Sequence, residues 1–185
     1  RDNNHPYRPA IIFRMAEAYL SYAEALNESS ERMSHKQEIL DNLNKIRHRA
    51  GIAEYGTGTD ENGFTRIKIN FSDQKEVRRL IHKERRVEFV GEGVRYHDLR
   101  RWKTAHYGIG NLNEQGENPD WGVNGPDYGM NYYGTEYTDQ GDNAFFKRTK
   151  YMDRVYPRKF YWYPIHQSEI DKDPTLVQGP FWLGE

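Results

Sequence analysis

The stretch that decides the fold runs from residue 84 to residue 102 and reads ERRVEFVGEGVRYHDLRRW. Apolar residues recur in it at three- and four-residue steps, which is the period of an amphipathic helix. The run Gly91-Glu92-Gly93 interrupts that period. The sequence therefore predicts two helices here, one from Ser72, as its N-cap, to about residue 90 and one over residues 94–105.

Two more helices are predicted upstream. The first begins at Ile11 and fades over residues 27–30, and the second begins at Ser34, whose spacing to Gln37 is typical of a capping box. Gly51 is suited to end the second helix. Two consecutive amphipathic helices joined by a short polar link resemble one tetratricopeptide repeat. The apolar positions expected to form the core are Ile12, Met15, Ala16, Tyr19, Leu20, Ala23, Leu26, Ile39, Leu40, Leu43, Ile46, Ala50, Val77, Leu80, Ile81, Val87 and Phe89.

The densest cluster of charge lies in residues 83–89 and 95–102, where five arginines accompany three carboxylates. Glu84 and Glu88 are four residues apart and share one helix face. Paired carboxylates can perform general acid/base chemistry, as in glycosidases. The surrounding arginines favour a different interpretation, in which bidentate ion pairs lock two helices together. We therefore expect these residues to support the scaffold and not to catalyse a reaction.

Residues 106–150 have a different character, because they lack a helical period and are rich in Gly, Asn and aromatic residues. Exposed aromatic rings can stack on sugars or peptide side chains, and Asn amides can hydrogen-bond hydroxyl groups. Long loops also often carry function. The alternative is a loop that packs on itself and covers the helices. The candidate ligand-binding residues in this insert are Trp121, Asn124, Tyr128, Asn131, Tyr132 and Tyr133.

Composition excludes several classes of protein. The chain has 185 residues, 36% of them apolar, with 14 Tyr, 8 Phe and 4 Trp, which is too aromatic for a disordered chain. A net charge of −1 argues against electrostatic binding of nucleic acid. There is no Cys, and the seven His show no metal-ligand spacing. We expect no cofactor and no metal.

Five motifs occur in an order that resembles the C-terminal region of the SusD/RagB family. The resemblance extends from Ile11 to Trp182 and leaves residues 106–150 unmatched. The motifs occupy residues 14–25, 43–51, 84–89, 93–102 and 163–170, and they are followed by Asp173-Pro174 and Pro180-Phe181-Trp182.

The resemblance implies a surface-exposed lipoprotein of the bacterial outer membrane, anchored through an N-terminus absent from this chain. It implies a binding protein and not an enzyme. The expected partner is a SusC-like TonB-dependent transporter, and the expected ligand is an oligosaccharide or polysaccharide, or a peptide in some members. A helical-repeat module that docks a protein and has no ligand site of its own is the alternative.

These observations predict a mainly α protein with tetratricopeptide-like helix pairs, long irregular loops and an extended C-terminal tail. Residues 1–185 are expected to form the C-terminal region of a SusD/RagB-like domain. Within it, the helical scaffold occupies residues 1–105, the aromatic insert residues 106–150 and the tail residues 151–185.

Overall fold

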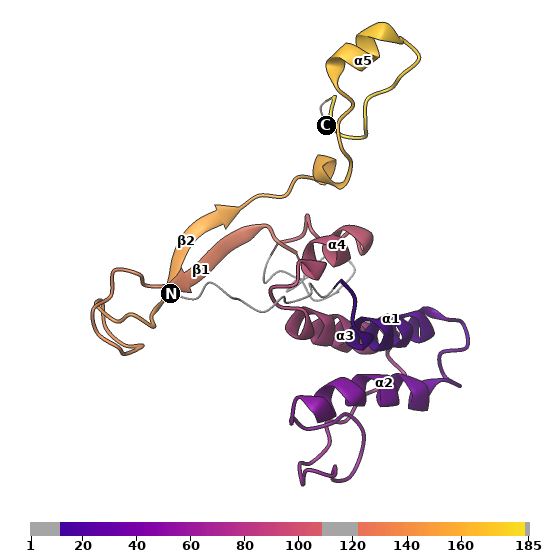
Figure 1. Ribbon diagram of the computed structural model, residues 1–185, viewed down its shortest axis with the longest axis vertical. Coiled ribbons are helices and arrows are strands. Elements are labelled where there is room, and N and C mark those ends of the chain that lie inside the picture. The colour runs from indigo at the N-terminus through magenta and orange to yellow at the C-terminus, as the bar shows by residue number, and fades with distance from the viewer. Residues whose placement is uncertain (1–11, 109–121, 184–185) are drawn as a thin grey trace, which may run out of the picture. The chain divides into compact units, whose positions relative to one another are not determined.

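The computed structural model describes residues 12–108 and 122–183 (Figure 1). The chain separates into two compact units, with the boundary between Gly93 and Val94. This boundary coincides with the helix break predicted at Gly91-Glu92-Gly93, and Gly91 and Gly93 both have positive φ angles. The scaffold was expected to occupy residues 1–105. The helix expected at its end begins at Val94 and lies in the second unit.

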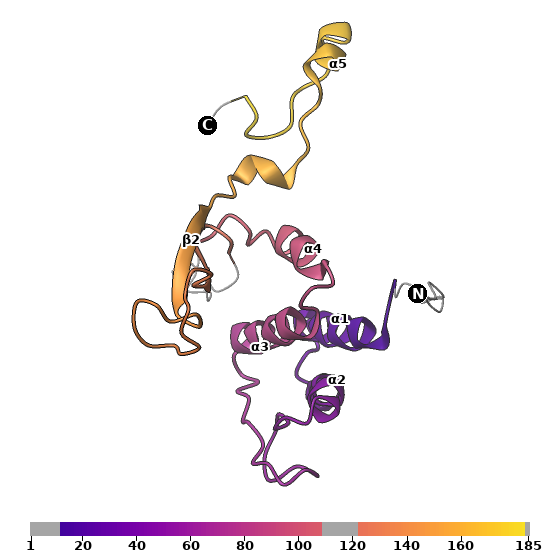
Figure 2. The same ribbon diagram turned by 60° about the vertical axis from the view of Figure 1, so that its left-hand side comes forward.

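The first unit contains three helices: α1 (Met15–Glu28), α2 (Lys36–Arg49) and α3 (Gln74–Glu88). Helix α1 packs against both α2 and α3, as Figures 1 and 2 show. The predicted apolar stripes meet in this core, and each fully buried Leu, Ile or Val contributes about 1.5–3 kcal/mol to folding. The core residues with no exposed surface are Leu20, Ala23, Ile39, Leu43, Val77 and Ile81.

Four predicted core positions are exposed, and both Ser caps were predicted wrongly. Met15 and Val87 lie on the solvent-facing sides of α1 and α3, whereas Ile12 precedes α1 and Ala50 follows α2. The Ser34 hydroxyl donates to the carbonyl of Glu31 (2.8 Å) and does not cap α2, which starts at Lys36. Helix α3 is capped by Asp73, one residue after Ser72.

The segment between α2 and α3 is a long loop organised by one buried carboxylate. Asp60 accepts hydrogen bonds from the backbone amides of Glu54 (3.1 Å), Asn62 (3.0 Å) and Phe64 (2.8 Å). Burial opposes ionisation, but these amide donors lower the pKa of Asp60 overall. Residues 64–71 make only single bridges to the rest of the loop, such as the one between Tyr55 and Ile67.

The second unit contains α4 (Val94–Arg101), an antiparallel hairpin of β1 (Gly125–Met130) and β2 (Arg148–Arg154), a 3-10 helix η1 (Arg158–Tyr161) and α5 (Gln167–Lys172). The hairpin was not predicted, and β2 crosses the expected boundary at residue 150. All seven residues of β2 are exposed, so its sequence has no alternation of apolar and polar residues to mark a strand. The expected extended tail contains the end of β2 and two short helices, η1 and α5.

Most of the regular secondary structure in the described part of the chain is helical, as the sequence predicts. Across residues 12–108 and 122–183, every helix is too short or too polar to span a lipid bilayer.

Candidate functional site

The loop that joins β1 to β2 presents two neighbouring tyrosines to solvent. The side chains of Tyr132 and Tyr133 are 83% and 90% exposed. Their rings lie edge to face, with centroids 5.8 Å apart. Rings exposed to this degree are accessible to a ligand or a partner. These two residues were predicted from the sequence as ligand-binding candidates, and the structure places them side by side.

Backbone contacts give this loop a defined conformation. The Asn131 backbone amide donates to the carbonyl of Lys147 (3.1 Å), and its side-chain amide donates to the carbonyl of Asp142 (3.2 Å). Gly134 lies so close to Ala144 and Phe145 that a Cβ atom there would be 2.6 Å from the Phe145 backbone nitrogen. The loop is therefore packed on itself, and it holds the tyrosine pair without burying it.

A second aromatic group lies on the same loop. The rings of Tyr137, Phe145 and Phe146 have centroids 5.3–6.3 Å apart. Sequence reasoning did not select these residues, because Phe145 and Phe146 are distant from Tyr137 along the chain and only the return of the loop brings them together.

Asn131 lies in the same loop, whereas Tyr128 and Asn124 lie further along the hairpin. Tyr128 is on β1, with the Arg148 guanidinium 4.0 Å from its ring centroid. The side-chain amide of Asn124 donates to the carbonyl of His106 (2.5 Å), and its oxygen accepts from the Tyr156 amide. Asn124 thus ties the base of the hairpin to the rest of its unit. Trp121 lies outside the described residues.

Glu84 and Glu88 of the first unit are ion-paired, as expected, but the arginines that pair with them here lie outside the predicted cluster. Glu84 on α3 accepts hydrogen bonds from Arg47 on α2 (2.5 Å) and from the hydroxyl of Tyr55 (2.8 Å). Burial and the charge of Glu84 both raise the pKa of Tyr55, so the hydroxyl stays protonated and keeps donating. Arg47 also lies over the ring of Tyr55. The Glu84 carboxylate is thus held within the protein by two donors.

Glu88 is bound in a similar way. Its carboxylate is paired with both Arg14 and Arg49, and Arg14 also pairs with Glu92 (2.7 Å). Burial opposes ionisation of Glu88, but hydrogen bonds from Arg49 and Arg14 lower its pKa overall. A general acid needs the opposite, a raised pKa. Glu88 therefore lacks the raised pKa of a glycosidase acid, and its ion pairs, like the two donors to Glu84, agree with a structural role.

A cavity of the first unit has a volume of about 690 Å³ and lies between α2 and the loop that follows it. Several of its polar groups are paired with one another. Asn44 exchanges two hydrogen bonds with the backbone of Tyr55, and Glu54 is paired with Arg66 (2.8 Å) and His48 (3.2 Å). Among the described residues, no group of three or more His, Asp or Glu side chains is placed to hold a metal ion.

Comparison with known proteins relates the chain to one family. The model of the SusD family matches residues 2–182. Two proteins of Formosa agariphila, SusD-like protein P38 and SusD-like protein P2, are 32% identical over 103 residues and 34% identical over 99 residues. These matches cover 56% and 52% of this chain, but only 19% and 17% of the two relatives.

Solved structures give the same relationship. A SusD-like protein of Bacteroides fragilis, BF3747, is 28% identical with a TM-score of 0.59, and the protein BT4246 is 29% identical with a TM-score of 0.59. Both matches cover 96% of this chain, and they cover 28% and 24% of the respective structures. The chain thus spans about a quarter of the solved proteins it matches and less than a fifth of the curated relatives.

Proposed function

We propose a function from the premise that this chain belongs to the SusD family. The chain is then part of a cell-surface protein that binds nutrient glycans without altering them. The partner would be a SusC-like TonB-dependent transporter in the outer membrane, and the protein would be held at the surface by a lipid anchor. Within this scaffold, we infer that α1 and α2 act as a tetratricopeptide-like helix pair.

The exposed pair Tyr132 and Tyr133 is the observation that carries this proposal. A tyrosine ring offers a flat apolar face and a hydroxyl group, and both features match a sugar ring, which has an apolar face and hydroxyl groups at its edge. Tyr also has few rotatable bonds, so little conformational entropy is lost when it binds. The self-packed loop reduces that cost further, since the two rings are already positioned.

A binding experiment with matched variants tests the proposal. We would measure retention of the protein in native gels containing single polysaccharides, followed by calorimetry with any that retards it. Replacing both Tyr132 and Tyr133 by Ala should weaken binding by about tenfold, since each stacking contact contributes about 0.5–1.5 kcal/mol. Tyr151→Ala is the control, because Tyr151 is an exposed tyrosine on β2 outside the loop. If the double variant bound as tightly as this control, the loop would not be the glycan site.

The same preparation separates the alternatives. Binding to a peptide panel, with no response to any glycan, would identify a peptide-binding member of the family. Co-purification with a transporter, with no response to either panel, would identify a docking module.

A further inference from the structure

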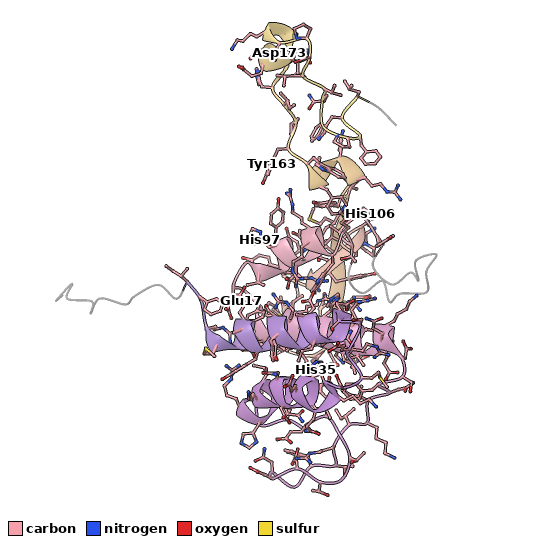
Figure 3. The ribbon with its side chains drawn as sticks, turned by 90° about the vertical axis from the view of Figure 1, so that its right-hand side faces the viewer. Glu17, His35, His97, His106, Tyr163 and Asp173 are labelled. Carbon is pink, nitrogen blue, oxygen red and sulfur yellow. The ribbon has the colours of Figure 1, made fainter. Side chains whose placement is uncertain are left out.

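A second cavity, in the unit that carries the tyrosine pair, has a cationic and aromatic lining. Its volume is about 430 Å³, and its lining residues are His97, Arg100, Arg101, Lys103, Tyr161 and Trp162. Among these six described residues, none is acidic, although the whole chain has a net charge of −1. Figure 3 shows His97 on α4 and Tyr163, the residue next to Trp162, on the same edge of this unit. Positive charge beside aromatic rings is a suitable environment for an anionic ligand.

Arg100 is held in place by neutral groups. Its guanidinium donates to the carbonyl of Tyr161 (2.8 Å) and to the hydroxyl of Tyr96 (2.5 Å). The same group lies 5.2 Å from the ring centroid of Tyr96 and 5.1 Å from that of Tyr163. These contacts fix the direction of the guanidinium but leave its charge in place. Arg101 differs, because its guanidinium pairs with the carboxylate of Asp98 (3.1 Å).

Lys103 occupies an unusual backbone conformation at the edge of the cavity. Its φ angle is +55°, in the left-handed region where Gly or Asn is the common residue after a helix. A lysine there costs about 1 kcal/mol relative to glycine. The helix dipole favours cations in the last turn of α4, which ends at Arg101. It does not require a lysine in a strained conformation beyond that turn. Lys103 therefore adds a second charge to the cavity at a conformational cost.

Trp162 supplies a ring surface next to these charges. Its ring lies 5.7 Å from that of Phe181 and 5.9 Å from that of Tyr161, so neighbouring rings support it. A pyranose could stack on this indole while an acidic substituent on the sugar reaches Arg100 and Lys103. The guanidinium fork is well matched to two oxygens of a carboxylate or a sulfate.

We propose that this cavity binds the carboxylate or sulfate group of an acidic saccharide, with Arg100 and Lys103 as the anion-binding residues and Trp162 as the stacking face. The inference rests on the proposed function, since it names the class of glycan that the protein would take.

The test compares acidic polymers with neutral polymers of the same backbone. Calorimetry would measure binding of polygalacturonate against its fully methyl-esterified form, and of dextran sulfate against dextran. We expect the protein to bind at least one acidic polymer more tightly than its neutral counterpart. Binding of polygalacturonate alone would identify the carboxylate as the recognised group, and binding of dextran sulfate alone would identify the sulfate.

Lys103→Asn removes the charge while retaining a residue that tolerates positive φ. It should weaken binding of the preferred acidic polymer by about two- to fivefold, the range of one exposed charge interaction. Lys172→Asn is the matched control, because Lys172 is an exposed lysine on α5 in the same unit. The control should bind like the unmodified protein.

Three results would overturn the inference: equal affinity for the acidic and neutral forms, equal losses in the Lys103 and Lys172 variants, or no binding to any of the four polymers. The two proposals fail separately. Glycan binding that depends on Tyr132 and Tyr133 but not on Lys103 would remove only the anionic site. Binding that depends on Lys103 and not on the tyrosines would remove only the tyrosine site.

Discussion

The buried pair of Arg47 and Glu84 allows a sharp test of the scaffold interpretation. The two side chains are 11% and 7% exposed, and Glu84 also accepts from Tyr55. Replacing Glu84 by Gln changes the charge with little change in volume, and it leaves the Arg47 cation buried without a counter-charge. Breaking a buried pair in this way costs about 3–5 kcal/mol. We expect about 3 kcal/mol here, because the Gln carbonyl can still accept both hydrogen bonds.

Urea denaturation at pH 7, followed by far-ultraviolet circular dichroism, measures this cost as a change in the free energy of unfolding. The matched control is Glu28→Gln. Glu28 pairs with Arg78 (2.5 Å) in the same unit, but the side chains of both Glu28 and Arg78 remain partly exposed to solvent. A pair of that kind contributes about 0–1 kcal/mol. A total stability of about 5–15 kcal/mol makes the difference between the two variants easy to resolve.

A double-mutant cycle completes the test. Arg47→Met removes the cation, so the further change of Glu84 to Gln should cost much less in that background than in the unmodified protein. Equal costs in the two backgrounds, or a Glu84→Gln cost no larger than that of Glu28→Gln, would refute the structural role argued for this pair.

Three further predictions follow from single contacts. The pKa of Glu88 is lowered in the folded state, so its carboxylate stabilises the protein above about pH 4.3, the usual Glu pKa, and this contribution is lost as the pH falls through the folded-state pKa. When the urea midpoint is measured at decreasing pH, it should therefore fall less steeply in the Glu88→Gln variant than in the unmodified protein. Gly134→Ala should disrupt its loop and increase proteolysis there, because the added methyl group would meet backbone atoms, whereas Gly129→Ala adds a methyl group in open space and should resist protease as the unmodified protein does. Asp73→Ala should lower the free energy of unfolding by about 0.5–2 kcal/mol through loss of the α3 cap, and an equal effect of Ser72→Ala would contradict that assignment.

The helices of the first unit could be predicted from sequence because their signal is local. Within each helix the apolar residues recur with the helical period. Leu20, Ile39, Leu43 and Ile81 are examples from the three helices, and each is fully buried. Helix starts were less predictable, because Ser34 and Ser72 can bond to several nearby backbone groups, and the sequence does not say which bond is made. The hairpin escaped prediction because β2 is exposed along its whole length and β1 is nowhere fully buried, so no buried face imposes an alternating pattern.

The candidate site shows the same division between local and long-range information. Tyr132 and Tyr133 could be selected because they are adjacent in an aromatic loop. The cavity beside α4 could not, because Tyr161 and Trp162 are about sixty residues from Arg100 and join it only through the fold.

Sequence alone determined that this chain forms amphipathic helices and concentrates its charge in residues 83–102, since both properties depend on neighbours a few residues apart. Only the tertiary structure decided which arginine meets which carboxylate. Arg47 and Glu84 are 37 residues apart in the chain, and their pairing depends on how α2 and α3 are brought together by the buried core. In the second unit, only the structure shows that Tyr132 and Tyr133 lie in solvent and that the distant residues Tyr161 and Trp162 line one cavity with Arg100 and Lys103.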